Sequence, residues 1–478
     1  MTGLKMESGT ILETDNLCFS FAEKGPYVLN SVCLTVKKGE SAVLMGPSGS
    51  GKSTLAYLLS GLYPDYAGFL KGEVLCRLGK INDLPAEERS RIVSLIFQNP
   101  DDQFAMETAG EEVLFTLENI AFPGDMKKKA EELLDVAGLN NFFDRRINEL
   151  SGGEKQKLSL ATALAADPEL LILDEPLANL DPASSGQLVD ILIKLKDAGK
   201  SFLIIDHRLD PWMEMLSSVI FLDRQGGLYP RKLSPSEIPV SRDIFKSLGL
   251  FYPGDPLWPE RISNFNNTEI VLKADNLSVT VKKRTIINNI DLILTKGSLT
   301  SIIGHNGIGK TTLLLSLCGL FKINGKLWRR GRPGLVFQNP GFQFLTQNIV
   351  DEVVMSIAAG GTCDKSKNAE LRALALSFLQ DFGLSNMNER SPWQLSQGQQ
   401  RRLAVLTMLA REREVLFLDE PTYAQDEEST ISIMHLLLER VDKGLAALFV
   451  THDIALARAY SDRIFRLDSD GLKLFSDS

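Results

Sequence analysis

Short apolar runs that end in glycine or in carboxylates recur along the chain. Two of them, 41–45 ("SAVLM") and 300–303 ("TSII"), run directly into a glycine, and two others, 170–173 and 415–418, run into Asp-Glu-Pro. Continuous apolar runs of this length are typical of strands that are buried on both faces of a parallel sheet. The glycine-rich loops that follow the first two runs open into segments with leucines at helical spacing. The pattern therefore predicts an α/β fold.

Two longer stretches have a different periodicity. Residues 108–164 and 349–409 carry apolar positions at helical spacing and few strand signals. We expect each to form a mostly helical subdomain beside a parallel-sheet core.

The chain is a tandem repeat. Four landmarks occur twice in the same order: "FQNP", ending at Pro100 and Pro340; "LSGGE" and "LSQGQ", starting at Leu150 and Leu395; "LDEP", ending at Pro176 and Pro421; and apolar runs that end at His207 and His452. The serine of the second landmark precedes the aspartate of the third by 23 residues in both halves, and that aspartate precedes the histidine by 33. We therefore predict two similar domains, 1–226 and 267–478, joined by a proline- and serine-rich linker over 227–266.

Composition narrows the choice of partners. The net charge of −9 argues against nucleic acid as a main partner, because binding to phosphates needs a basic face. The five cysteines are scattered and predict neither a disulfide framework nor a metal site. The N-terminus does not resemble a signal peptide, and no apolar run is long enough to span a bilayer. We expect any membrane association to be peripheral and to depend on partner proteins.

Both glycine-rich loops match the phosphate-binding pattern G-x-x-x-x-G-K-[ST]. Glycines permit the positive φ angles that turn backbone N–H groups toward a phosphate, and the following helix adds its dipole. We expect Lys52 and Lys310 to reach the outer phosphates, and Ser53 and Thr311 to bind Mg²⁺. The predicted binding residues are Gly46, Pro47, Ser48, Gly49, Ser50, Gly51, Lys52, Ser53 and Thr54 in the first loop, and Gly304, His305, Asn306, Gly307, Ile308, Gly309, Lys310, Thr311 and Thr312 in the second.

Two carboxylates close each of the later strands. Placing Asp174-Glu175 and Asp419-Glu420 at the end of a buried strand is unfavourable for stability, because their desolvation is costly. In phosphoryl-transfer sites the first carboxylate binds Mg²⁺ and the second activates water. We assign these roles to the two pairs.

The segments that begin at Ser151 and Ser396 satisfy the capping box S-x-x-[EQ], so each predicts a helix start. A cap alone does not explain Gly153 and Gly398 in the first turn, where glycine is unfavourable. These glycines leave the N–H groups open to a phosphate. A well-capped helix and a phosphate contact are compatible interpretations.

Three further kinds of side chain are candidates for the sites. His207 and His452, two of only four histidines, follow apolar runs at equal distances from the carboxylates, which favours a site role over an incidental one. Gln98 and Gln338 stand before Asn-Pro, where plain turn chemistry is an alternative. Phe21 offers a ring on which a base could stack, although a strand phenylalanine is more often part of the core.

Together these motifs resemble those of ATP-binding cassette (ABC) ATPases over nearly the whole chain. The resemblance rests on the two Walker A loops, the glutamines, the "LSGGE" and "LSQGQ" signatures, the "LDEP" Walker B strands and the histidines. It implies two P-loop parallel-sheet domains in tandem, each with an antiparallel β region and a helical signature subdomain. It also implies hydrolysis of ATP with Mg²⁺, with Gln98 and Gln338 as further metal ligands.

In that family each nucleotide lies between the phosphate loop of one domain and the signature of the other. The resemblance implies two head-to-tail sites within this chain. One joins Lys52, Gln98, Glu175 and His207 to Ser396 and Gly398. The other joins Lys310, Gln338, Glu420 and His452 to Ser151 and Gly153.

A narrower resemblance concerns "IFQNPDDQF", "VFQNPGFQF" and the linker segment "SLGLFYPGDPLW". These are similar to energy-coupling factor (ECF) transporter ATPases and their C-terminal appendage, and a fused pair is similar to the duplicated ATPase of importers for the thiamine precursor hydroxymethylpyrimidine. The resemblance implies an integral membrane scaffold subunit, a substrate-binding membrane subunit and a place at the cytoplasmic face of the membrane.

Two other classes compete with the importer. A translation-associated tandem cassette is expected to have a charged helical linker and a basic surface. A cassette of DNA repair or metal-cluster assembly needs coiled-coil arms or cysteine clusters. Neither set of features stands in this sequence. The chain departs from the family at Gln397, in place of a signature glycine, and at Val281, the position that corresponds to Phe21.

Overall fold

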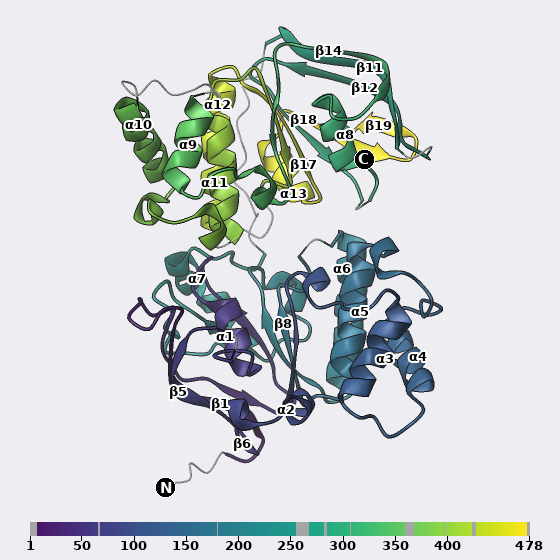
Figure 1. Cartoon of the computed structure of the whole chain (residues 1–478), viewed down its shortest axis with the longest axis vertical. Helices are drawn as coiled ribbons and strands as arrows, with labels where there is room; N and C mark the ends of the chain where they lie inside the picture. Colours follow the sequence, from purple (N-terminus) through teal and green to yellow (C-terminus); the bar gives the residue numbers. More distant parts are fainter. Residues whose placement is uncertain are drawn as a thin grey trace. The chain divides into compact units, whose positions relative to one another are not determined.

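The computed structural model describes residues 7–65, 67–178, 180–254, 267–281, 284–305, 307–358, 368–395, 397–422 and 427–475. The chain divides into two compact units, Met1–Asp255 and Pro256–Ser478. Each unit is described by itself, and Figure 1 labels its elements.

A five-stranded parallel sheet forms the centre of the first unit. Its order is β10-β4-β9-β8-β7, and every neighbouring pair runs parallel. All residues of β4, β8 and β9 are buried, as expected for apolar runs covered on both faces. The bounds are β4 (Ser41–Met45), β7 (Val93–Ile96), β8 (Leu170–Asp174), β9 (Ser201–Ile205) and β10 (Ser218–Phe221).

A second, antiparallel sheet covers part of this core. Strand β1 pairs with β2, β3 and β5, and β5 pairs with β6. Side chains of this sheet, of helix α1 and of the parallel strands form one apolar cluster. The bounds are β1 (Thr10–Ser20), β2 (Leu29–Val32), β3 (Thr35–Lys37), β5 (Phe69–Cys76), β6 (Gly79–Lys80), α1 (Lys52–Leu59) and α2 (Ala86–Ile92).

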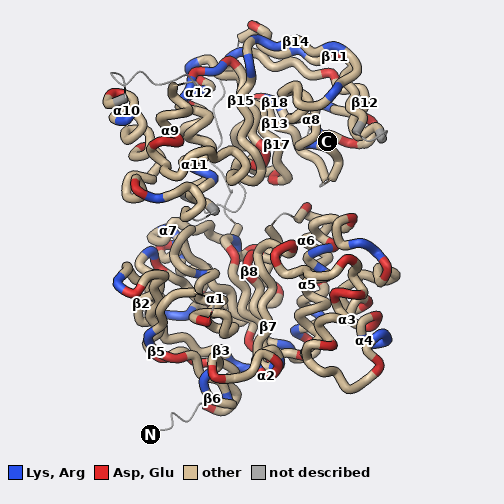
Figure 2. The backbone as a smooth tube through the Cα atoms, in the orientation of Figure 1, with Lys and Arg blue, Asp and Glu red and all other residues tan. Residues whose placement is uncertain are grey.

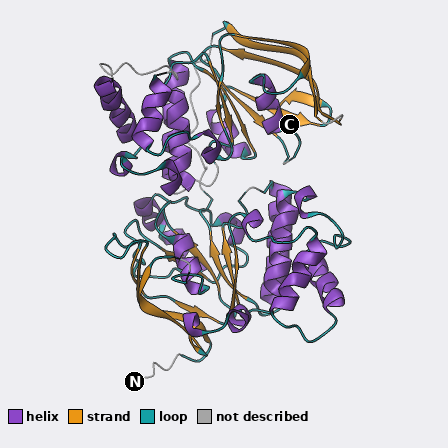
Figure 3. Ribbon diagram, in the orientation of Figure 1, coloured by secondary structure: helices purple, strands orange, loops and turns teal. Residues whose placement is uncertain are grey.

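The helical subdomain of the first unit stands beside the sheets (Figure 3). A second apolar cluster joins it to the other face of the parallel sheet. Capping boxes begin two of its helices, at Thr108-Glu111 and at Ser151-Glu154. The helices are α3 (Ala109–Asn119), α4 (Met126–Val136) and α5 (Gly152–Leu164), followed by α6 (Pro182–Asp197) and α7 (Arg242–Leu248).

Part of the predicted linker packs onto the first unit. Leu233, Ile238, Phe245 and Leu248 belong to the same apolar cluster as the helical subdomain. Burial of these side chains explains why the compact unit extends to Asp255. Residues 255–266 lie outside the described part of the chain, and the domain boundaries proposed from the sequence stay predictions.

The second unit repeats this plan with a longer sheet. Its order is β15-β16-β17-β13-β18-β19, parallel except for the β18–β19 pair, and a separate antiparallel sheet has the order β12-β11-β14. The strands are β11 (Ile270–Val281), β12 (Arg284–Thr295), β13 (Leu299–Ile303), β14 (Ile323–Arg329), β15 (Gly334–Val336), β16 (Val415–Asp419), β17 (Ala446–Thr451), β18 (Arg463–Asp468) and β19 (Gly471–Leu474). The helices are α8 (Lys310–Leu317), α9 (Ile349–Ile357), α10 (Asn368–Asp381), α11 (Gln397–Leu409), α12 (Glu427–Asp442) and α13 (Ile454–Tyr460).

Short 3₁₀ turns complete the described structure: η1 (Ile81–Asp83), η2 (Pro100–Asp102), η3 (Ile147–Glu149), η4 (Asp210–Trp212), η5 (Pro235–Val240), η6 (Pro340–Gln343), η7 (Ser385–Met387) and η8 (Pro392–Gln394). The predicted fold class is confirmed: two α/β units, each with a parallel core, an antiparallel sheet and a helical subdomain. Of the helices that the structure describes, none combines the length and the apolar character needed to cross a bilayer.

Candidate active sites

The first phosphate loop connects β4 to α1. Gly49 and Gly51 have φ angles of +81° and +97°, which a side chain would make strained. A Cβ on Gly46 would lie 2.6 Å from the carbonyl oxygen of Leu222, so this position also needs glycine. The Lys52 side chain is buried, and its Nζ donates to the carbonyls of Gly46 at 2.8 Å and Pro47 at 3.1 Å. The loop thus surrounds its own lysine head group, which an incoming phosphate can engage.

The second loop folds in the same way between β13 and α8. Gly307 and Gly309 have φ angles of +78° and +110°. Lys310 Nζ donates to the carbonyls of Gly304 at 2.7 Å and His305 at 3.1 Å. Asn306 lies outside the described residues.

Glu175 is held at the end of β8 by several groups. Its backbone has a φ of +46°, unusual for a residue with a side chain, and its N–H donates to the Ile205 carbonyl at 2.9 Å. One carboxylate oxygen lies 2.9 Å from Nε2 of His207, and the other accepts from Nε2 of Gln98 at 2.7 Å. The structure therefore brings together three residues that are far apart in sequence.

These neighbours decide the charge of Glu175. Burial raises the pKa of its carboxyl, but His207, Lys52 and Gln98 together outweigh burial and leave the pKa lowered. The carboxylate is thus ionised at neutral pH. An ionised, buried carboxylate with a fixed orientation is suited to accept a proton.

Asp174, one residue earlier, is in the opposite situation. Among the described residues, neither of its carboxylate oxygens has a partner with hydrogen-bond geometry. Burial and then the charge of Glu175 raise its pKa to about 7, although Ser53 and Lys52 lie close enough to oppose the shift. A divalent cation would supply the missing positive charge, so these oxygens fit the predicted Mg²⁺ site.

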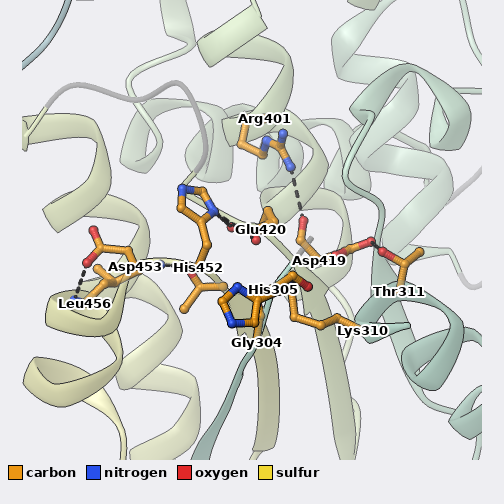
Figure 4. A network of polar contacts seen from close by, with 11 residues as sticks. Gly304, His305, Lys310, Thr311, Arg401, Asp419, Glu420, His452, Asp453 and Leu456 are labelled. Atoms are coloured by element: carbon orange, nitrogen blue, oxygen red, sulfur yellow. Dashed lines mark hydrogen bonds and ion pairs between the residues drawn. The ribbon is translucent and has the colours of Figure 1, made fainter. Parts of the chain in front are cut away.

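The second site is built from equivalent residues (Figure 4). Glu420 also has a positive φ, +50°, and Nδ1 of His452 lies 3.1 Å from each of its carboxylate oxygens. Burial lowers the pKa of His452, but the charge and hydrogen bond of Glu420 outweigh burial and raise it. Thr311 donates to Asp419 Oδ2 at 2.7 Å. Burial raises the pKa of Asp419 to about 6, and the Thr311 hydrogen bond opposes the shift.

Thr311 and Asp419 also fit a shared metal. Both are oxygen ligands of the kind that Mg²⁺ prefers, and neighbouring ligands of an octahedral Mg²⁺ are ~2.9 Å apart by geometry. The observed contact of 2.7 Å already has this spacing.

The two sites differ in their glutamines. Gln98 contacts Glu175, whereas Gln338 is exposed and is not brought to Glu420 by any described contact.

The sequence analysis missed Arg401. This side chain is only 1% exposed, and its Nη1 lies 3.3 Å from the carbonyls of Phe337 and Asp419 (Figure 4). Gln156 is the matching residue of the first unit, with a buried Nε2 that lacks a described partner. The sequence did contain a signal for Arg401: an arginine stands in the helix after the second signature, where the first cassette has a glutamine.

Asp206 was also missed. It accepts from the backbone N–H of Arg208 at 3.0 Å and from Nε1 of Trp212 at 2.9 Å, and burial raises its pKa. These bonds anchor the segment that follows β9 and carries His207. The only feature of the sequence that pointed to Asp206 was its place directly before His207 in "IIDH".

The signature residues contact their own helices. Ser151 and Glu154 form both bonds of the predicted capping box, with Glu154 N–H donating to Ser151 Oγ at 3.3 Å and Ser151 N–H donating back at 2.7 Å. A Cβ on Gly153 would lie 3.0 Å from the side chain of Ser184 on α6, so a larger residue here would require Ser184 to move by a few tenths of an ångström. Gly398 is buried, and Ser396 lies outside the described residues. No described contact links Ser151 to the loop of its own unit.

Phe21 is 55% exposed and forms the edge of an aromatic cluster. Its ring lies edge-on to Phe19 at 5.2 Å and to Tyr63 at 6.1 Å. An exposed ring fixed by two others is available for stacking. The side chain of Val281, its counterpart, lies outside the described part.

Comparison with known proteins decides the family. Residues 29–178 and 287–423 match the model of the family described as "ABC transporter". The chain belongs to this family. It is an ABC ATPase with two nucleotide-binding cassettes in tandem, and ATP is its substrate.

Individual relatives support the same family assignment. The chain is 34% identical, over 97% of its length and 90% of the relative's, to the "Putative HMP/thiamine import ATP-binding protein YkoD" of Bacillus subtilis (strain 168). It is 30% identical to a "Putative ABC transporter ATP-binding protein" of Streptococcus pneumoniae, covering 95% of this chain and 88% of that protein. Among solved structures, an archaeal ribosome recycling factor, aABCE1, superposes with a TM-score of 0.64 at 20% identity, over 96% of this chain and 89% of that one. This last likeness concerns the fold of tandem ABC ATPases alone.

Proposed function

We propose that this ABC ATPase is the motor subunit of a membrane importer for a vitamin or vitamin precursor, with hydroxymethylpyrimidine or thiamine as the favoured substrate. The relative named for HMP/thiamine import supports the substrate, because the similarity extends over 97% of this chain. The ECF-like glutamine segments and linker support the transporter class.

The observation that carries the catalytic proposal is the buried glutamate of each site. Glu175 and Glu420 are the general bases that take a proton from the attacking water. His207 and His452 orient these carboxylates, at 2.9 and 3.1 Å, and stabilise their charge. Gln98 adds a second contact in the first site. A base held in this way needs no reorganisation when the proton is transferred.

The phosphate loops hold the nucleotide. When the nucleotide binds, Lys52 and Lys310 donate to its outer phosphates in place of the loop carbonyls. The N–H groups of the loops bind the remaining phosphate oxygens. Ser53 with Asp174, and Thr311 with Asp419, would hold Mg²⁺, with Gln98 and Gln338 as further ligands. Bound Mg²⁺ neutralises the charge that develops on the phosphates.

The two cassettes form two head-to-tail sites. Ser396 and Gly398 complete the site of Lys52, and Ser151 and Gly153 complete the site of Lys310. The glycines in the first turn of α5 support this role, because they leave room for a phosphate at the start of a well-capped helix.

The partners are an integral membrane scaffold and a substrate-binding membrane subunit, which place the chain at the cytoplasmic face of the membrane. In the first cassette, Asp101 and Asp102 are candidates to bind an arginine of the scaffold, since a carboxylate forms a charge-assisted hydrogen bond with a guanidinium group. Asp101 already contacts Lys155 of α5 at 2.6 Å, and Asp102 accepts from Asn99 at 2.8 Å. Because both carboxylates already have partners within the first unit, we propose instead that the second cassette makes an apolar contact with the scaffold through Phe342, which is 77% exposed.

The decisive experiment measures partners and uptake together. In a strain that lacks the chain, the intact gene is expected to restore uptake of labelled hydroxymethylpyrimidine, and Glu175→Gln with Glu420→Gln is expected to abolish it. Pull-down of the tagged chain from detergent-solubilised membranes is expected to recover integral membrane proteins. Sedimentation with ribosomes and no membrane partner would instead support the translation-associated class.

A further inference from the structure

The second cassette contains a cationic pocket of about 900 Å³. Six cations line it: Lys296, Arg332, Arg411, Arg413, Arg440 and Lys443. Only two carboxylates, Glu412 and Glu414, share the lining. This excess of positive charge stands out in a chain whose net charge is −9.

The pocket lies at the edge of the sheet opposite to the nucleotide site. Much of its lining comes from residues just before β15, β16, β17 and β13, four neighbouring parallel strands. Asp419, Glu420 and His452 follow the other ends of β16 and β17. A strand of five residues is ~16 Å long, so a ligand in this pocket cannot be the nucleotide that Glu420 hydrolyses. Figure 2 shows several Lys and Arg segments close together beside the α12 label.

Most of these cations lack a counter-charge. Within the part of the chain that the structure describes, no carboxylate lies within ion-pair distance of Arg332, Arg411, Arg413 or Lys443. Burial and the nearby charge of Arg411 lower the pKa of the Arg413 guanidinium, which indicates that the two cations repel each other. Arg413 is fixed by a 3.3 Å bond from Nε to the Met408 carbonyl. Such uncompensated charges favour an anionic ligand.

Three of the pocket's cations have no cationic counterpart in the first cassette. Alignment of the two "LDEP" strands sets Ala166 and Pro168 at the positions of Arg411 and Arg413. The same alignment sets Ala198 at the position of Lys443. The acidic groups at this edge of the first sheet are paired within the unit, Asp167 with Lys200 and Glu169 with Arg77. Arg411, Arg413 and Lys443 therefore do not belong to the structural plan that the cassettes share.

We propose that this pocket binds a soluble phosphorylated molecule that carries at least two phosphate groups. Planar guanidinium groups match the geometry of phosphate oxygens, and several of them around one pocket suit a ligand of high negative charge. The volume is in the range of organic-ligand sites and is large for a single phosphate ion. Met408, Leu409 and Leu445 supply apolar surface for an uncharged portion of the ligand.

The test uses the full-length protein with both phosphate loops saturated by a non-hydrolysable ATP analogue and Mg²⁺. Tripolyphosphate is then titrated by calorimetry at physiological ionic strength. The double variant Arg411→Gln/Lys443→Gln changes two exposed residues, and we expect it to bind tripolyphosphate at least about tenfold more weakly with unchanged ATPase activity. The control, Lys128→Gln/Lys194→Gln, removes the same charge from exposed positions of α4 and α6 and is expected to bind like the wild type.

Three results would overturn the proposal. The first is equal binding by the wild type and the pocket variant. The second is an equal loss in the control variant, which would mean a general charge effect. The third is flotation with phosphatidylcholine vesicles that contain phosphatidic acid, dependent on Arg411 and Lys443, without binding of tripolyphosphate. That outcome would assign the pocket to a lipid headgroup.

Discussion

Replacing Asp174 by Asn is expected to stabilise the nucleotide-free protein, most strongly at alkaline pH. Folding buries this carboxyl and raises its pKa from 3.8 to about 7. Because the folded pKa lies above the unfolded one, the folded state prefers the protonated form. The wild type therefore loses stability as the pH rises from about 4 through about 7, and an asparagine does not titrate.

The size of this stability difference follows from the pKa shift of Asp174. Three pKa units correspond to about 4 kcal/mol, the full penalty of the buried charge above pH 8, and the penalty is about 2 kcal/mol at pH 5. An unpaired asparagine amide has its own desolvation penalty, of about 1–3 kcal/mol, but that penalty is independent of pH. The advantage of Asp174→Asn over the wild type should thus grow by roughly 2–3 kcal/mol between pH 5 and pH 8.5.

Urea unfolding with chelator and without nucleotide measures this difference. Trp212 is fully buried in the first unit, and replacing the other three tryptophans by Phe makes its fluorescence report that unit. Asp419→Asn, in the second unit, is the matched control and should leave the Trp212 transition unchanged. A stability difference that does not change with pH, or a wild type that is more stable at pH 8.5, would refute the reasoning. The variant should also lose Mg²⁺-dependent tightening of ATP binding at the first site.

Four other substitutions test three separate features of the sites. Glu175→Gln and Glu420→Gln should each trap ATP and reduce turnover ~10²–10⁴-fold at their own site, because each removes a general base; unchanged steady-state hydrolysis in Glu420→Gln would make the second site non-catalytic. Phe21→Ala should weaken nucleotide binding several-fold through loss of a stack worth about 0.5–1.5 kcal/mol, measured by titration in a Lys310→Ala background, and equal affinity would assign the ring to packing alone. Gly46→Ala should abolish binding at the first loop, since its Cβ would meet a backbone carbonyl at 2.6 Å, and retained binding would mean that the loop can move aside.

The sequence by itself determined the repeat, the fold class and most of each site. Buried parallel strands must be continuously apolar, so β4, β8, β13 and β16 were visible as runs. Phosphate loops need glycine at fixed positions, and Gly51 and Gly309 do adopt the predicted positive φ angles. The capping box at Ser151 depends only on residues that are close in sequence, and the structure confirms it.

Tertiary structure alone decided how the site residues are charged and connected. The pKa of Asp174 depends on how deeply β8 is buried, and the contact between Gln98 and Glu175 joins residues that follow two neighbouring strands. The repeat predicts the same role for Gln338 as for Gln98, but among the described contacts only Gln98 reaches its glutamate. The pocket around Arg411 and Lys443 could not be predicted for the same reason: its cations come from four chain segments that are adjacent only because parallel strands begin at one edge of a sheet. Local sequence patterns specify strands and turns, whereas burial and charge pairing depend on neighbours that the folded chain brings together.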